Sequence, residues 1–160
     1  MPAPTRPFSV LGIEQIAIGG LDLEALRSLW IDTLGLEQSE TFRNESENVE
    51  GLIAFAGFGP TRVSMNLLKP LDVNRSPRAH KPALNHIGLW IDDLPAAVDW
   101  LTAKGIEFTP RGIRKGAANC DITFIHPNGG GQGVLIELVQ APRELIDLYN
   151  ERRRAAGDSV

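Results

Sequence analysis

Two matching stretches of the chain decide the fold, GIEQIAI at residues 12–18 and ALNHIGL at residues 83–89. Both place a polar residue among aliphatic ones in the alternating pattern of a half-buried β-strand. Each stretch is followed by an aspartate and a leucine, Asp22-Leu23 in the first case and Asp93-Leu94 in the second. Because an aspartate side chain accepts hydrogen bonds from the unpaired amides of a first helical turn, we expect a helix to begin after each aspartate.

The two halves of the chain stay alike beyond these helices. Gly35 and Gly105 stand where the left-handed residue that ends a helix is expected. Strand-like runs follow at residues 49–56 and 62–68 in the first half, and at residues 119–126 and 133–139 in the second. Each half therefore reads as a strand, a helix and two or three further strands, which indicates an internal repeat of one module.

The repeat predicts an α+β fold and divides the chain into five parts. These are an N-terminal arm (1–10), a first βαβββ module (11–71), a linker (72–83), a second βαβββ module (84–141), and a C-terminal helix and tail (142–160). The linker is inferred from its prolines and mixed charge. The C-terminal helix is expected from about Arg143 to Ala155.

Four polar residues occupy matching positions in the two modules. From Gln15 to His86 is 71 positions, and from Asn66 to Glu137 is also 71. Each stands in an otherwise apolar strand, where a buried polar group without a partner costs about 1–3 kcal/mol. Strand alternation allows all four to face inward, and a shared divalent metal ion or bound water would satisfy them together. Taken singly, His86 also reads as a hydrogen-bonded core histidine, and the two amides as structural hydrogen-bonding groups.

The composition is that of an ordinary globular protein, with 160 residues, a net charge of −4, 42% hydrophobic and 22% charged residues. It excludes a disordered or fibrous chain, and without a dense basic stripe it argues against nucleic-acid binding. Cys120 is the sole cysteine, so neither an internal disulfide nor a thiolate metal cluster is expected. No apolar run approaches a membrane span, and the proline-punctuated start does not resemble a signal peptide. We expect a cytoplasmic protein without a membrane partner.

The most specific motifs lie in the second half of the chain. They are LNHI at residues 84–87, DDL at residues 92–94, and FIHP through GVLIEL at residues 124–138. These motifs resemble the vicinal oxygen chelate superfamily, which includes the glyoxalases, and come closest to its methylmalonyl-CoA epimerase-like members. The resemblance spans about residues 11–141. It implies that the two βαβββ modules form a cupped mixed sheet, the glyoxalase-like fold, with a metal ion within the cup and pairing of two chains into a homodimer.

The resemblance also implies a set of metal ligands, namely Gln15, Asn66, His86 and Glu137. Two of them depart from the epimerase pattern. Gln15 stands where a histidine is usual, and Asn66 stands where glutamine or glutamate is expected. One imidazole, one carboxylate and two amides suit a borderline or hard divalent ion, so cobalt, nickel, manganese or zinc is expected.

The chemistry shared by epimerases and glyoxalases of this superfamily is removal of a proton beside a carbonyl group. Glu137 is one candidate proton carrier. Glu50 is the second, as the best match to a carboxylate that the resemblance places before the first hairpin, although it also reads as a solvent-facing strand residue. The expected function is a metal-dependent epimerase acting on an acyl-CoA. A glyoxalase-type lyase acting on a thiol adduct, favoured by Gln15, and a non-enzymatic binding protein of the bleomycin-resistance type stay open as alternatives.

Overall fold

The chain adopts the repeated element order that its sequence predicts. The computed structural model describes residues 5–116 and 119–157, so the first residues of the expected arm and the last of the tail lie outside the described residues. Along the chain the order strand, helix, three strands occurs twice, as β1-α1-β2-β3-β4 and β5-α2-β6-β7-β8, and is followed by α3. This order confirms the two βαβββ modules.

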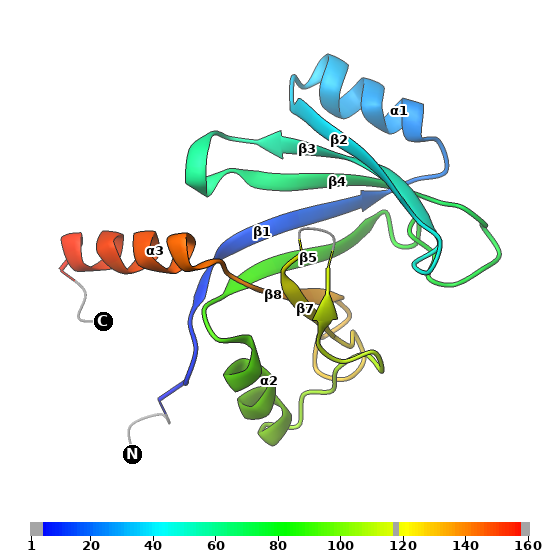
Figure 1. Cartoon of the computed structure of the whole chain (residues 1–160). Coiled ribbons are helices and arrows are strands. Elements are labelled where there is room, and N and C mark those ends of the chain that lie inside the picture. Colours follow the sequence, from blue (N-terminus) through cyan, green and yellow to red (C-terminus); the bar gives the residue numbers. More distant parts are fainter. Residues whose placement is uncertain (1–4, 117–118, 158–160) are drawn as a thin grey trace. The chain divides into compact units, whose positions relative to one another are not determined.

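The described chain divides into two compact units, shown in colours along the sequence in Figure 1. Unit 2 is Glu14–Ile87, and unit 1 is the remainder. The strands β1 (Val10–Gly19) and β5 (Leu84–Ile91) each contribute residues to both units. The boundaries expected for the modules and the linker stay a prediction.

Unit 2 contains a sheet with the strand order β2-β3-β4-β1-β5. Its other elements are α1 (Leu23–Arg27), the π-helical turn η1 (Ser28–Thr33), β2 (Glu37–Asn44), β3 (Val49–Ala56), the 3-10 turn η2 (Gly59–Thr61) and β4 (Val63–Pro70). The helix begins as expected, because the Asp22 carboxylate accepts a hydrogen bond from the Ala25 amide at 3.0 Å. It ends before Gly35, whose φ of 79° requires glycine's freedom. The sequence did not predict the π-helical turn.

The two faces of the unit 2 sheet have different coverings. On one face, which we name the helix face, Leu52, Ala54, Met65 and Leu67 pack with the apolar residues of α1 and η1. The other face carries Gln15, Ser64 and Asn66, and we name it the polar face. The register settles this division, because β1 runs parallel to β4 with Gln15 opposite Ser64 and Ala17 opposite Asn66. Partners in a register share a face, and neighbours along a strand alternate between faces.

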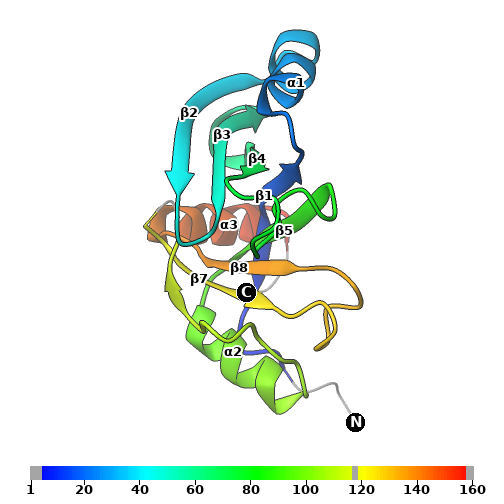
Figure 2. The same ribbon diagram turned by 90° about the vertical axis from the view of Figure 1, so that its right-hand side faces the viewer.

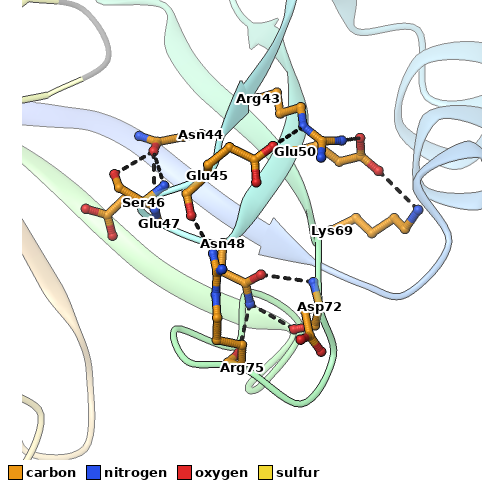
Figure 3. Close-up of polar contacts among 10 residues, drawn as sticks. All are labelled: Arg43, Asn44, Glu45, Ser46, Glu47, Asn48, Glu50, Lys69, Asp72 and Arg75. Atoms are coloured by element: carbon orange, nitrogen blue, oxygen red, sulfur yellow. Dashed lines mark hydrogen bonds and ion pairs between the residues drawn. The ribbon is translucent and has the colours of Figure 1, made fainter.

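The segment that follows β4 is fastened to the β2–β3 hairpin (Figure 3). Asn48 is fully buried with a φ of 53°, and its Nδ2 donates to the carbonyl oxygens of Asp72, Arg75 and Pro77 at 2.8, 2.8 and 3.1 Å. Its Oδ1 accepts from the Asp72 amide at 2.9 Å. The Arg75 guanidinium also donates to the Glu45 carbonyl. The expected linker is therefore an ordered part of unit 2.

Unit 1 contains the strand order β1-β5-β8-β7-β6 and two helices. Its further elements are α2 (Leu94–Ala103), β6 (Arg114–Lys115), β7 (Asp121–Ile125), β8 (Ile136–Gln140) and α3 (Arg143–Ala155). Phe8, Ile91, Leu94, Ala97, Ile125 and Leu138 form its core between α2 and the strands, an arrangement visible in Figure 2. The Asp93 carboxylate caps α2 by accepting from the Ala96 amide at 3.0 Å, as expected. The expected bounds of α3 are confirmed.

Among the described residues, no helix is both long and apolar enough to span a bilayer.

Candidate metal and catalytic site

Three of the four expected metal ligands form one hydrogen-bonded cluster in unit 2, with Gln15 at its centre. The Asn66 Nδ2 donates to the Gln15 Oε1 at 2.5 Å, and the Gln15 Nε2 lies 2.8 Å from the His86 Nε2. Their strands β4, β1 and β5 are neighbours in the sheet. The structure therefore brings Gln15, Asn66 and His86 together. We name this group the amide–imidazole cluster.

Strand alternation explains why Gln15 and Asn66 meet. Asn66 pairs with Ala17, two residues from Gln15, so the two amides lie on the same face of adjacent strands. Ser64 lies between them in register, and its hydroxyl donates to the Asn66 Oδ1 at 2.8 Å. With this bond and the one to Gln15, both ends of the Asn66 amide have a partner.

Asn85 determines which nitrogen of His86 carries the proton. The Asn85 Nδ2 donates to the Ala79 carbonyl at 3.2 Å, which leaves its Oδ1 as an acceptor. This oxygen lies 2.9 Å from the His86 Nδ1, so that nitrogen must be the donor. The His86 Nε2 therefore has a lone pair and accepts from the Gln15 amide. A neutral imidazole with a lone pair on Nε2 is the form of histidine that binds a metal ion.

Glu137, the fourth expected ligand, lies in unit 1. It is on β8 opposite Phe124 of β7, and only 6% of it is exposed. The next residue, Leu138, packs in the core beneath α2, so Glu137 occupies the face of its strand that points away from the helix. Asn66 has the same relation to Leu67 and α1 in unit 2. The two modules thus present their matching polar residues on equivalent strand faces.

Glu50 does not join the amide–imidazole cluster. In the β3–β4 register it pairs with Lys69, whereas Asn66 pairs with Ile53, three positions away. An odd separation along a strand reverses the face, so Glu50 lies on the helix face and Asn66 on the polar face. The packing agrees, because Val49, the neighbour of Glu50, packs with the polar-face residues Ala17 and Leu68.

The carboxylate of Glu50 is instead held between two cations (Figure 3). Its Oε1 lies 3.1 Å from the Lys69 Nζ, and its Oε2 lies 3.6 Å from the Arg43 Nη1. Arg43 and Lys69 are the register partners of Glu50 on β2 and β4. This ion-paired group links three adjacent strands.

The residues of the site fit a hard or borderline divalent ion. Within residues 5–116 and 119–157, no group of three or more His, Cys, Asp or Glu side chains is placed to hold a metal, so an ion here would depend on amide oxygens. His86 is held in its ligand form, and Gln15 and Asn66 each supply such an oxygen. Binding would replace the bonds among these three side chains. The buried Glu137 carboxylate supplies a negatively charged donor of the type these ions prefer.

Two residues of this site were not predicted from the sequence, Asn85 and Ser64. Asn85 directly precedes His86 in the LNHI motif, and Ser64 is two positions before Asn66 and hence on the same strand face. Both signals were available in the sequence. They identify a neighbour of a ligand, whereas the hydrogen bonds themselves depend on side-chain placement.

Comparison with known proteins follows the same direction. The model of the glyoxalase/bleomycin resistance protein/dioxygenase superfamily matches residues 14–124. The mitochondrial methylmalonyl-CoA epimerase of Mus musculus is 31% identical over 144 residues, which cover 86% of this chain and 78% of that protein. Methylmalonyl-CoA epimerase from Mycobacterium tuberculosis has a TM-score of 0.72 at 28% identity and covers 92% of this chain and 97% of its own.

A further methylmalonyl-CoA epimerase, solved in complex with methylmalonyl-CoA and NH4+, also has a TM-score of 0.72. It is 27% identical and covers 84% of this chain and 97% of its own. These likenesses confirm the predicted glyoxalase-like fold.

Proposed function

Because the chain belongs to the glyoxalase/bleomycin resistance protein/dioxygenase superfamily, we propose that it is an acyl-CoA epimerase of the vicinal oxygen chelate type. It removes and returns a proton on the carbon beside a thioester carbonyl, with methylmalonyl-CoA as the first substrate to test. The observation that carries the proposal is the amide–imidazole cluster, in which Gln15, Asn66 and His86 meet on one face of the sheet. The curated and substrate-bound epimerases that the chain resembles support it.

The metal ion proposed for this site is cobalt, nickel, manganese or zinc, with Gln15, Asn66, His86 and Glu137 as its ligands. A bound divalent ion supplies Lewis acidity that stabilises negative charge developing on a carbonyl oxygen. Asn85 contributes by keeping the His86 lone pair on Nε2. Ser64 contributes by orienting the Asn66 amide.

Glu137 is the proposed proton carrier. Its burial supports the assignment, because a carboxylate removed from water is a stronger base toward a weakly acidic carbon. Inversion at a carbon also requires a proton donor on the opposite side of the substrate. The role of Glu50 as this second group stays a prediction, and its place on the helix face argues against direct transfer.

The test is exchange of the substrate α-proton with deuterated water, followed by NMR on metal-loaded protein. Methylmalonyl-CoA and other 2-substituted acyl-CoAs are the substrates. Wild-type protein should exchange the proton, and Glu137→Gln should abolish exchange. Glu144→Gln, in the first turn of α3, is the matched control and should exchange like the wild type. Absence of exchange with every acyl-CoA would contradict the epimerase and leave the lyase or the binding protein as the function.

We also propose that the chain acts in the cytoplasm as a homodimer. Support for pairing is the edge strand β2, which has a free hydrogen-bonding side in the order of unit 2, since such edges need cover. Apolar residues of α3, among them Leu145 and Ile146, are only partly buried and offer a second contact. A monomer by light scattering at micromolar concentration would contradict pairing. Fractionation of cells that produce the protein tests its location.

A further inference from the structure

Arg62 is fixed in place by an aromatic ring at the end of the polar face. It follows η2 and precedes β4, and its guanidinium carbon lies 3.7 Å from the centroid of the Phe55 ring. Its backbone is extended, with φ −61° and ψ 147°, so strand alternation continues through it. Phe55 is the register partner of Ser64. Arg62, Ser64 and Asn66 therefore follow one another on the polar face.

The charge of Arg62 is not neutralised by a neighbouring carboxylate. Other arginines of unit 2 are paired: Arg27 with Glu24 and Asp32, and Arg43 with Glu45 and Glu50. For Arg62, the structure shows no such partner among the residues that it describes. The polar-face side chains that follow it, Ser64 and Asn66, are uncharged. Its hydrogen-bond donors are thus available to a ligand.

We propose that Arg62, stacked on Phe55, binds an anionic group of the acyl-CoA substrate, which is either the carboxylate of the acyl part or a phosphate of CoA. The proposal rests on the proposed epimerase function and names a specificity residue for it. A planar guanidinium matches both anions, since it donates two parallel hydrogen bonds to carboxylate or phosphate oxygens. Stacking on a ring leaves the edge of the guanidinium free for this and reduces the conformational entropy lost on binding.

The position of Arg62 suits a contact with the same substrate that reaches the amide–imidazole cluster. Arg62 and Asn66 are four residues apart on an extended chain, so their Cα atoms are separated by about 13 Å. A molecule with a reacting end and a remote anionic end spans such a distance. The cluster supplies one imidazole and neutral amides in unit 2, so Arg62 adds the cation that it lacks.

The test compares Arg62→Ala, Arg62→Lys and Phe55→Leu with the matched control Arg27→Ala. Arg27 lies on α1, which covers the helix face, and loses the same charge. Isothermal titration calorimetry gives the Kd of CoA and of methylmalonyl-CoA, a readout that does not require activity. Proton exchange gives the KM of methylmalonyl-CoA, of its N-acetylcysteamine thioester, which has no phosphate, and of 2-methylbutyryl-CoA, which has no free carboxylate.

We expect Arg62→Ala to weaken methylmalonyl-CoA about 10-fold to 100-fold, the effect of losing a charge-assisted hydrogen bond. Arg62→Lys and Phe55→Leu should give smaller losses, and Arg27→Ala none. A loss that persists with the N-acetylcysteamine thioester assigns Arg62 to the carboxylate. A loss that persists with CoA alone and with 2-methylbutyryl-CoA assigns it to a phosphate.

Equal binding of both CoA compounds by Arg62→Ala and Arg27→Ala would overturn the proposal. So would a wild-type protein that binds neither compound. Wild-type protein that binds CoA compounds but exchanges no proton would contradict only the epimerase function, and the calorimetric comparison would still decide the role of Arg62.

Discussion

Asn85 Oδ1 accepts a hydrogen bond from His86 Nδ1 at 2.9 Å, and this contact holds the imidazole as a metal ligand. The bond from Asn85 Nδ2 to the Ala79 carbonyl fixes the asparagine in turn. A donor nitrogen that is oriented from behind loses little freedom when an ion binds in front. Asn85 is therefore a positioning residue for His86.

Asn85→Ala should lower the affinity for a divalent ion about 10-fold to 100-fold, the usual effect of removing the partner of a ligating histidine. Asn85→Asp keeps an acceptor and should stay close to the wild type. Calorimetric titration with zinc or cobalt measures the affinity. Asn74→Ala is the control, because Asn74 lies exposed in the segment after β4. Unchanged affinity in Asn85→Ala would show that the tautomer of His86 does not limit binding.

Removal of the metal should remove activity. Wild-type protein dialysed against a chelator should lose exchange of the substrate α-proton, and added cobalt, nickel, manganese or zinc should restore it. His86→Ala removes the imidazole of the proposed site, so added metal should restore little activity to it. Metal content by elemental analysis accompanies each NMR assay. Full exchange by chelator-treated protein would contradict a metal-dependent reaction.

Glu50→Gln should retain proton exchange, because Glu50 lies on the face of the β3–β4 pair that is opposite to Asn66. The substitution removes the ion pairs with Lys69 and Arg43. The Glu50 side chain is 31% exposed, so the free energy of unfolding should fall by no more than about 1 kcal/mol. NMR exchange and urea denaturation measure the two effects. Loss of racemisation in a folded Glu50→Gln variant would establish Glu50 as the second proton carrier.

Asn48→Ala should lower the free energy of unfolding by about 3 kcal/mol or more. The substitution removes four hydrogen bonds of a buried side chain and leaves carbonyl groups of Asp72, Arg75 and Pro77 without their donor. It also places a residue less tolerant of a left-handed backbone at φ 53°. Urea denaturation measures the loss. Asn44→Ala, at an exposed turn of the same hairpin, is the control and should cost less.

Local chemistry in the sequence was sufficient to predict the elements. Asp22 and Asp93 cap the helices because a carboxylate two to three residues from free amides needs no distant partner. Strand positions followed from alternation, and the repeat of Gln15 and Asn66 at His86 and Glu137 followed from their equal spacing. The π-helical turn at Ser28–Thr33 was beyond this reasoning, since its spacing of apolar residues also suits an α-helix.

The tertiary structure decided which polar residues meet. Glu50 stands one position from Val49, and a shift of one residue in strand register moves a side chain to the other face of a sheet. Sequence alone does not state that register, because the number of residues in the β3–β4 turn sets it. The partners of Asn48 and Asn85 are likewise chosen by segments that folding brings near, and hydrogen bonds require distances that a sequence pattern does not contain. The sequence by itself determined the donor types, and the pairing of strands determined where they point.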